Sequence, residues 1–194
     1  MRMPAAERRQ QLLDTAVVVF GRNGYHDTSM NDIAEAAGVT KPVLYQHFES
    51  KRDLFRELLG EIGAQLRDTI AKTTADAAGP RQQIELGFRA YFTFVAEHND
   101  AFRVMFGAGT RRDEEFASEA REVESSVAEL VAGLIEIPGI TERHRELLAN
   151  GIVGLAESSC RYWLLHEVDV DPTTLAAQVS QLAWAGLRGV GSAG

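Results

Sequence analysis

Apolar residues recur along most of the chain with the spacing of α-helices. Near the N-terminus, Leu12, Ala16, Val19 and Phe20 stand at i, i+4, i+7 and i+8, so one face of a helix carries all four. No segment combines sustained alternation of apolar and polar residues with the β-branched and aromatic content of a strand. The pattern therefore predicts an all-α fold.

Two short helices are expected before residue 49. The earlier one begins at Thr28 and Ser29, which are good N-cap residues, and stops at Gly38. The later one begins at Thr40 and carries Pro42 in its first turn, where the missing N–H would have no partner in any case. Two short helices joined by a turn, the second with a polar exposed face, are typical of a helix-turn-helix, whose second helix enters the DNA major groove.

The rest of the chain is expected to form longer and more apolar helices. A fourth helix follows Glu49-Ser50 and ends before Gly79-Pro80, and a later break falls at Gly107 to Gly109. Further helices are predicted over residues 81–98, 101–107, 113–136, 141–167 and 172–188, which makes about nine in all. We expect a small N-terminal domain over residues 1–52 and a larger helical domain over residues 53–194.

Charge is distributed unevenly along the chain. The net charge is −8, but residues 1–52 carry +1 and the remainder carries −9. The acidic average therefore does not exclude a nucleic-acid partner for the N-terminal segment. The charge-rich run from Arg111 to Glu124 is typical of a solvated helix face.

The sequence points to a reducing compartment. Cys160 is the single cysteine, so an intramolecular disulfide is excluded. The N-terminal segment lacks the apolar core of a signal peptide, and no uncharged apolar run approaches the roughly 18 residues of a membrane span. We expect an unprocessed cytoplasmic protein with no membrane contact.

The helix that begins at Thr40 exposes an unusual face. A helical wheel places Leu44 and Phe48 on the buried side, with Pro42 and Gln46 opposite and Val43 and Tyr45 beside them. Apolar groups on such a surface suit contact with thymine methyls, sugars and phosphates, and a glutamine amide can hydrogen-bond a base edge.

Two lysines occupy unfavourable positions. Lys41 and Lys51 each stand first in a helix, where the macrodipole disfavours a cation by roughly 0.3 to 1 kcal/mol. A bound phosphate at each helix start would reverse that sign. The alternative is that both are ordinary surface lysines offset by nearby acidic residues such as Asp53.

The run from Thr28 to Phe55, T-S-M-N-D-I-A-E-A-A-G-V-T-K-P-V-L-Y-Q-H-F-E-S-K-R-D-L-F, closely resembles the DNA-binding signature of the TetR family of transcriptional regulators. The resemblance covers roughly residues 10 to 60 and includes the F-x-x-x-G-Y element from Phe20 to Tyr25. It implies an N-terminal three-helix helix-turn-helix domain, and a larger C-terminal helical domain that binds a ligand and dimerises.

The resemblance also implies roles for individual residues in binding double-stranded operator DNA. Tyr45, His47 and Lys51 correspond to phosphate contacts, and Ser29 and Thr40 to phosphate contacts at helix starts. The groove-facing residues would be Lys41, Pro42, Val43 and Gln46. Position 42 is commonly glycine in the family, so the proline is expected to change how closely the backbone approaches the bases.

A homodimer through the last two long helices is a further implication of the resemblance. The segment 172–188 is compatible, because Leu175, Val179 and Leu182 lie on one stripe that Ala183 and Trp184 widen beyond the needs of a one-sided helix. The segment 141–167 is likewise apolar on more than one side. The alternative is that both are central core helices.

A small-ligand pocket is expected in the C-terminal helices, where this family holds its ligands. The candidate lining residues are aromatic or apolar residues at helical spacing and one cysteine, although such a stripe also suits an ordinary core. They are Phe88, Tyr91, Phe92, Val95, Phe102, Phe106, Phe116, Cys160 and Trp163. Such a lining favours an apolar or amphipathic ligand, and resemblance to lipid-responsive members of the family suggests a fatty acid or acyl-CoA.

An enzyme and a helical adaptor are the competing classes. The chain has no H-E-x-x-H, no G-x-S-x-G and no phosphate-binding glycine loop, and we expect no catalytic site, metal or cofactor. An adaptor gives no reason for the exposed Tyr45, Gln46 and His47. We therefore expect a repressor that its ligand releases from DNA; an activator or a ligand-independent regulator of the same fold remains the alternative.

Overall fold

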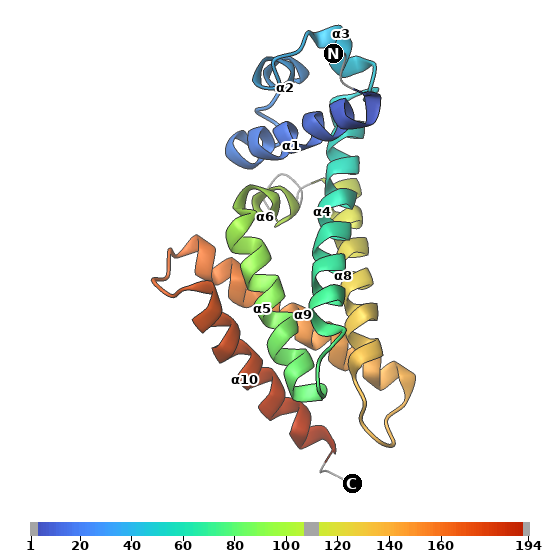
Figure 1. Cartoon of the computed structure of the whole chain (residues 1–194), viewed down its shortest axis with the longest axis vertical. Helices are drawn as coiled ribbons and strands as arrows, with labels where there is room; N and C mark the ends of the chain where they lie inside the picture. Colours follow the sequence, from blue (N-terminus) through green and yellow to red (C-terminus); the bar gives the residue numbers. More distant parts are fainter. Residues whose placement is uncertain (1–3, 107–112, 192–194) are drawn as a thin grey trace. The chain divides into compact units, whose positions relative to one another are not determined.

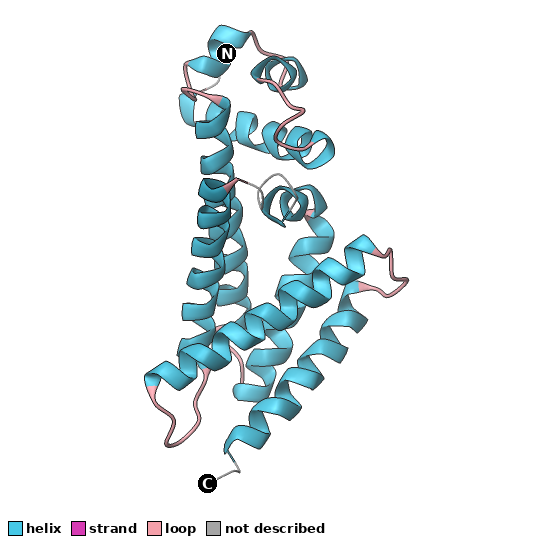
Figure 2. Ribbon diagram, turned by 180° about the vertical axis from the view of Figure 1, so that it is seen from behind, coloured by secondary structure: helices cyan, strands magenta, loops and turns pink. Residues whose placement is uncertain are grey.

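The computed structural model describes residues 4–106 and 113–191 as helices joined by loops, with no strand among them (Figure 2). The prediction of an all-α fold is confirmed. Their bounds, labelled in Figure 1, are α1 (Ala5–Asn23), α2 (Met30–Ala36), α3 (Lys41–Tyr45), α4 (Lys51–Thr74), α5 (Pro80–Glu97), α6 (Asn99–Phe106), α8 (Glu114–Leu134), α9 (Glu142–Leu165) and α10 (Pro172–Gly191).

The helices divide into two compact units. The first unit comprises Met1–Gly63 and His98–Glu122, and the second comprises Ala64–Glu97 and Val123–Gly194. Helices α4 and α8 each contribute residues to both units. This division differs from a boundary at residue 52, which stays a prediction about the part of the chain that folds as a DNA-binding domain.

The first unit is built around α1. Leu12, Ala16 and Phe20 on one face of this helix are buried, as their spacing predicts. Helix α1 packs against α2 and also closely against the start of α6. At that crossing Gly21 leaves no room for a side chain, because a Cβ atom there would lie 2.6 Å from the Cβ atom of Asp100.

The turn between α2 and α3 depends on a glycine. Gly38 has a φ angle of +66°, in the left-handed region that glycine adopts without steric cost. The N–H of Val39 donates to the carbonyl oxygen of Ala34 and closes the end of α2. The chain therefore changes direction within a few residues of Gly38, and α3 packs against α2.

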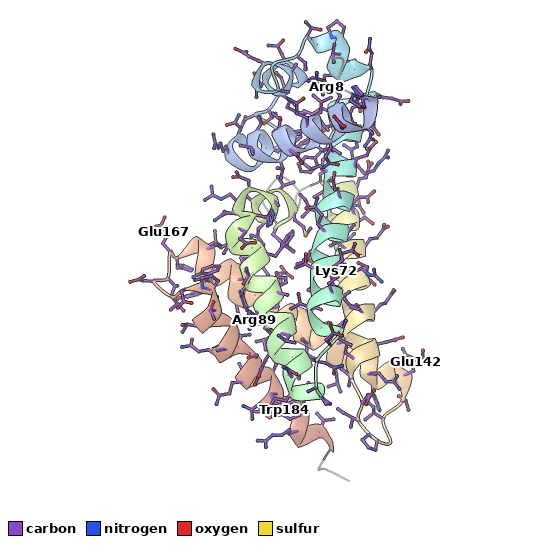
Figure 3. The ribbon with its side chains drawn as sticks, viewed as in Figure 1. Arg8, Lys72, Arg89, Glu142, Glu167 and Trp184 are labelled. Carbon is purple, nitrogen blue, oxygen red and sulfur yellow. The ribbon has the colours of Figure 1, made fainter. Side chains whose placement is uncertain are left out.

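The second unit packs α5 against α10, with α9 beside both. The apolar face of α5 is buried through Phe88, Tyr91, Phe92 and Val95. Figure 3 shows the polar side chains projecting from these helices, with Glu142 at the start of α9 and Glu167 just beyond its end. Within the described residues, no helix is both long and apolar enough to cross a membrane.

The predicted helix boundaries agree with the observed ones to within a few residues. Helix α4 ends at Thr74, a few residues before the expected break at Gly79-Pro80, and α3 ends at Tyr45, followed by a turn up to Phe48. Both Lys41 and Lys51 begin their helices, as expected. The predicted break at Gly107 to Gly109 lies outside the described residues.

Candidate nucleic-acid interface and ligand cavity

Helix α3 presents a compact exposed face. Leu44 and Phe48 are buried beneath it, whereas Tyr45 is 45% exposed and Pro42 and Gln46 are exposed. The ammonium of Lys41 lies 5.9 Å from the centre of the Tyr45 ring. The wheel drawn from the sequence therefore describes this helix correctly, with Val43 and His47 half-buried at its sides.

The N-terminus of α3 is uncapped. The side chain of Thr40 makes no capping hydrogen bond, and no acidic residue stands in the first turn. The helix dipole and the side chain of Lys41 both favour an anion at this end. This helix start can therefore accept a phosphate without displacing a protein group.

The start of α2 is different, because a carboxylate already occupies it. The hydroxyl of Ser29 accepts from the N–H of Asp32 at 3.2 Å, and the N–H of Ser29 donates to the carboxylate of Asp32 at 2.7 Å. These hydrogen bonds hold the pKa of the Asp32 carboxyl below its usual range. A phosphate beside Ser29 would meet this negative charge, so α2 is a weaker anion site than α3.

Lys51 is engaged within the protein. Its Nζ donates to the carbonyl oxygens of Tyr25 and Thr28, each at 2.8 Å, and lies 4.3 Å from the centre of the Tyr25 ring. Burial lowers the pKa of this ammonium, and the nearby Asp27 carboxylate opposes that effect. Lys51 therefore anchors the loop between α1 and α2 to the start of α4, which the resemblance to the family did not indicate.

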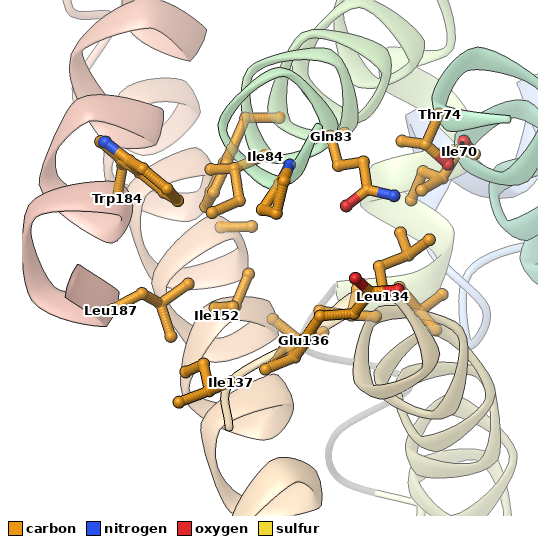
Figure 4. Close-up of a pocket in the computed structure, with 18 of the residues that line it drawn as sticks. Ile70, Thr74, Gln83, Ile84, Leu134, Glu136, Ile137, Ile152, Trp184 and Leu187 are labelled. Carbon is orange, nitrogen blue, oxygen red and sulfur yellow. Dashed lines mark hydrogen bonds between the residues drawn. The ribbon is translucent and has the colours of Figure 1, made fainter. Parts of the chain in front are cut away.

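The second unit contains an apolar cavity of about 260 Å³, drawn in Figure 4. Residues from α4, α5, α8, α9 and α10 line it, together with the segment that follows α8. Its apolar lining includes Ile70, Ile84, Phe88, Val127, Val131, Leu134, Ile137, Ile152, Trp184 and Leu187. This volume is just below the roughly 300 to 1,000 Å³ that is usual for small-ligand sites.

Few polar groups reach this cavity. The hydroxyl of Thr74 is already used, since it donates to the carbonyl oxygen of Ile70 at 2.9 Å. Figure 4 shows the indole nitrogen of Trp184 pointing away from the cavity, and the tips of Gln83 and Glu136 pointing toward its interior. Arg188 is the remaining charged lining residue. Recognition of a polar ligand group would therefore depend on Gln83, Glu136 and Arg188.

Of the residues proposed from sequence as a ligand lining, Phe88 and Tyr91 border the cavity. Burial raises the pKa of Tyr91 well above its usual value, and the hydroxyl has no hydrogen-bond partner among the described residues. Because that oxygen is fully covered, the ring of Tyr91, and not its hydroxyl, faces the cavity.

The other proposed lining residues lie elsewhere. Phe102 and Phe106 on α6, together with Phe116 on α8, belong to the first unit. Phe92 and Trp163 contact each other edge to face, with ring centroids 6.5 Å apart. Neither Val95 nor Cys160 borders the cavity. Burial raises the pKa of the Cys160 thiol to about 12, which suits an inert core residue.

Sequence analysis also did not indicate most of the residues that line this cavity. The missed positions lie on α8, in Ile135 to Pro138 after it, and on the part of α10 near Trp184 and Leu187. The run I-E-I-P from Ile135 was a usable signal, because apolar residues beyond a helix end need cover. Aromatic residues at helical spacing indicate other positions, but aromatic side chains suit a solid core at least as well as a ligand lining.

A helix-turn-helix with an exposed second helix, in a chain that also has a cavity-containing helical unit, is the arrangement of a DNA-binding transcription regulator. The family model described as "Bacterial regulatory proteins, tetR family" matches residues 12–58. A second, described as "Tetracyclin repressor-like, C-terminal domain", matches residues 80–186. The chain belongs to the tetR family of bacterial regulatory proteins.

Relatives of known function are also transcription regulators. The chain is 33% identical over 190 residues to the transcriptional activator FasR of Mycolicibacterium smegmatis, covering 97% of this chain and 87% of FasR. It is 24% identical over 191 residues to the fatty acid metabolism regulator protein of Bacillus subtilis, covering 92% of this chain and 94% of that protein.

Solved structures share the fold over the whole chain. A TetR-like transcriptional regulator from Rhodococcus sp. RHA1 aligns with a TM-score of 0.78 and 30% identity, covering 97% of this chain and 100% of the other. FadR from Bacillus subtilis, solved in complex with stearoyl-CoA, aligns with a TM-score of 0.80 at 22% identity, covering 91% and 98%. At that identity the second likeness shows the fold alone.

Proposed function

We propose that this regulator is a homodimeric repressor that a small apolar or amphipathic ligand releases from its operator. The observation that carries the DNA-binding part is the uncapped start of α3 beside the exposed Tyr45 and Gln46. The cavity of the second unit provides a place for the ligand. A ligand that weakens operator binding must itself bind less tightly to the DNA-bound protein by the same factor.

In this proposal Thr40 and Tyr45 contact phosphates. Lys41 contacts a phosphate at the edge of the groove, and Pro42, Val43 and Gln46 face the bases. His47, half-buried beside this face, is an edge contact. Ser29 contributes its hydroxyl hydrogen, since the oxygen already accepts from Asp32. Lys51 has used two of its three N–H donors within the protein, so it supports the interface chiefly by holding the loop before α2.

The dimer is proposed to form through α9 and α10, because apolar side chains remain uncovered on both helices. Leu147 and Leu165 on α9 are 69% and 70% exposed, and Leu182 on α10 is 63% exposed. Gly151 and Gly154 lie on the same side of α9 as Leu147, with open space above them. Exposed leucines beside small residues suit close packing against a second copy.

An acyl chain is the proposed ligand, as a fatty acid or an acyl-CoA. The cavity offers mostly apolar walls, and aliphatic residues from several helices contribute to them. The fatty acid metabolism regulator of Bacillus subtilis and the stearoyl-CoA complex of FadR support this choice by similarity. Cytoplasmic location and the absence of an enzymatic activity are part of the same proposal.

Activation is a second candidate, because FasR, which shares 33% identity over almost the whole chain, is a transcriptional activator. The same DNA-bound dimer represses or activates according to where its operator lies relative to the promoter. Transcription in vitro from the bound promoter separates the two: a repressor lowers transcript yield when added, and an activator raises it.

The proposed interface is tested by fluorescence anisotropy of purified full-length protein on DNA flanking its own gene. We expect saturable binding that survives random competitor DNA and weakens with salt. Tyr45→Ala should weaken binding without changing the dimer measured by sedimentation. An unchanged operator affinity for Tyr45→Ala would contradict the assigned face.

A further inference from the structure

Beyond the acyl-chain class, we infer that the cavity selects a ligand whose polar end is uncharged, such as an ester, thioester, amide or alcohol, over a free carboxylate. This inference rests on the proposed ligand-binding function of the second unit. It follows from the polar groups that the cavity offers and from the sign of their charges.

Gln83 and Glu136 come from different elements and face the same space. Gln83 lies on α5, Glu136 lies in the segment after α8, and Figure 4 shows both side-chain tips pointing into the cavity near Leu134. The side chain of Gln83 is half-buried, and it makes no hydrogen bond to any described residue. Its amide therefore has a donor and an acceptor for a ligand group.

The charges at the cavity do not favour an anion. Glu136 supplies a negative charge and Arg188 a positive one, both on exposed residues at the edge of the lining, so the charged lining is neutral in sum. Arg188 already interacts with the protein. A ligand carboxylate would have to give up its hydration beside the carboxylate of Glu136, which repels it. A carbonyl or hydroxyl avoids that cost and can hydrogen-bond the amide of Gln83.

The remaining cavity surface gives no compensation for a buried anion. The hydroxyl of Thr74 donates to the carbonyl oxygen of Ile70, and the hydroxyl of Tyr91 is buried away from the cavity. The indole nitrogen of Trp184 points away from the cavity. A carboxylate placed deeper than Gln83 would therefore meet hydrocarbon alone. Selectivity for an uncharged end follows from the lining of the cavity, whichever compound supplies the chain.

A matched set of ligands, each with a chain of twelve carbons, tests the inference. The set is dodecanoate, dodecanol, the N-acetylcysteamine thioester of dodecanoic acid and dodecanoyl-CoA. Binding to the full-length protein is measured by calorimetry at a pH where the carboxylate is ionised. We expect dodecanol and the small thioester to bind about tenfold more tightly than dodecanoate. The comparison of the two thioesters then shows whether the phosphates of CoA contribute.

Two variants test which side chains cause the preference for uncharged ligands over dodecanoate. Glu136→Gln should strengthen dodecanoate binding severalfold, which reduces the difference in affinity between dodecanoate and the small thioester. Gln83→Leu should weaken the binding of dodecanol and of the small thioester. Glu129→Gln is the control, because Glu129 is exposed on α8 and does not border the cavity. Glu129→Gln should bind all four ligands with the same relative affinities as the native protein.

The outcomes separate this inference from the proposed function. Dodecanoate binding as tightly as the uncharged compounds, or unchanged dodecanoate affinity in Glu136→Gln, would overturn the inference while an acyl-chain ligand stands. Loss of dodecanoate binding in Arg188→Gln would likewise assign the polar end to a carboxylate. Failure of every compound to bind would overturn the acyl-chain function, and the inference with it.

Discussion

Arg52, in the first turn of α4, and Asp113, directly before α8, form a two-armed ion pair. Nη1 of Arg52 lies 3.1 Å from Oδ2 of Asp113, and Nη2 lies 3.1 Å from Oδ1. Arg52 also binds Glu115, with Nε 2.7 Å from Oε2, and its guanidinium lies 4.8 Å from the centre of the Phe116 ring. One arginine therefore joins the start of α4 to the start of α8 across 61 positions of sequence.

The first prediction is that Arg52→Gln lowers the melting temperature. The substitution removes a bidentate pair, leaves two carboxylates close together, and uncovers the ring of Phe116. The matched control is Arg67→Gln, because among the described residues Arg67 pairs with its neighbour Asp68 alone, at 4.0 Å on an exposed surface. Differential scanning calorimetry should show a clearly lower melting temperature for Arg52→Gln and an almost unchanged melting temperature for Arg67→Gln. Equal melting temperatures for the two variants would contradict the role given to Arg52.

The second prediction concerns how the loss of stability in Arg52→Gln depends on pH. Hydrogen bonds from Arg52 hold the pKa of the Asp113 carboxyl below its usual value. Because the folded pKa is lowered, the stabilisation is present above the unfolded pKa of about 3.9 and is lost as pH falls through the folded pKa. The stability difference between the native chain and Arg52→Gln should therefore shrink below about pH 4. Chemical denaturation at neutral and acidic pH measures it; a constant difference would exclude Asp113 as the source.

The acidic residues of this cluster illustrate where sequence analysis stops. The run from Arg111 to Glu124, whose first two residues lie outside the described ranges, has the composition of a solvated helix face. Asp113 and Glu115 within it are partners of Arg52, which no local pattern could indicate because the pairing is long-range. Helix positions follow from local periodicity and capping, so the sequence predicts them to within a few residues. Ion pairs between residues far apart in the sequence depend on how the helices pack, and local periodicity does not indicate that packing.

Lys41 and Lys51 show the same limit at the candidate site. Both stand first in a helix, so local rules assign them the same role. The structure separates them, because Lys51 binds the carbonyl oxygens of Tyr25 and Thr28 whereas Lys41 lies over the exposed Tyr45. Similarly, the helical spacing of the apolar residues on α5 suits both a core and a ligand lining, and it does not indicate which of them border a cavity.

The third prediction uses this difference. Lys41→Ala should weaken operator binding and make its dependence on salt shallower by about one counterion, with unchanged thermal stability. Lys51→Met keeps the length of the side chain but loses both hydrogen bonds, so it should destabilise the folded protein by about 1 kcal/mol. Anisotropy titrations over a salt series and thermal unfolding measure the two effects. The assignment is wrong if the variants behave alike in both measurements.

The fourth prediction tests the crossing of α1 and α6. Gly21→Ala places a Cβ atom 2.6 Å from the Cβ atom of Asp100, so the helices must separate, at a cost of about 1–3 kcal/mol. Gly60→Ala is the control, since Gly60 lies in α4 with no atom within 4 Å of the added Cβ. There the substitution should stabilise the helix by up to about 1 kcal/mol. Opposite signs in thermal unfolding are expected, and stabilisation by Gly21→Ala would disprove the close contact.

The last prediction separates ligand response from DNA binding. Val131 on α8 and Ile152 on α9 border the cavity, so Val131→Phe and Ile152→Phe should fill part of its 260 Å³. Since the added atoms enter empty space, little overpacking is expected, and the operator affinity without ligand should be retained. Release of operator DNA by the N-acetylcysteamine thioester of dodecanoic acid should be lost in both variants.

Gly133→Ala is the matched control for these substitutions, because Gly133 lies on α8 with open space around it and outside the cavity lining. It should respond to the ligand as the native protein does. Anisotropy of labelled operator, titrated with the thioester, measures all four proteins under one condition. If both filled variants still release DNA at the native ligand concentration, the ligand acts from another site; if both lose operator binding without ligand, the cavity supports the DNA-bound conformation itself.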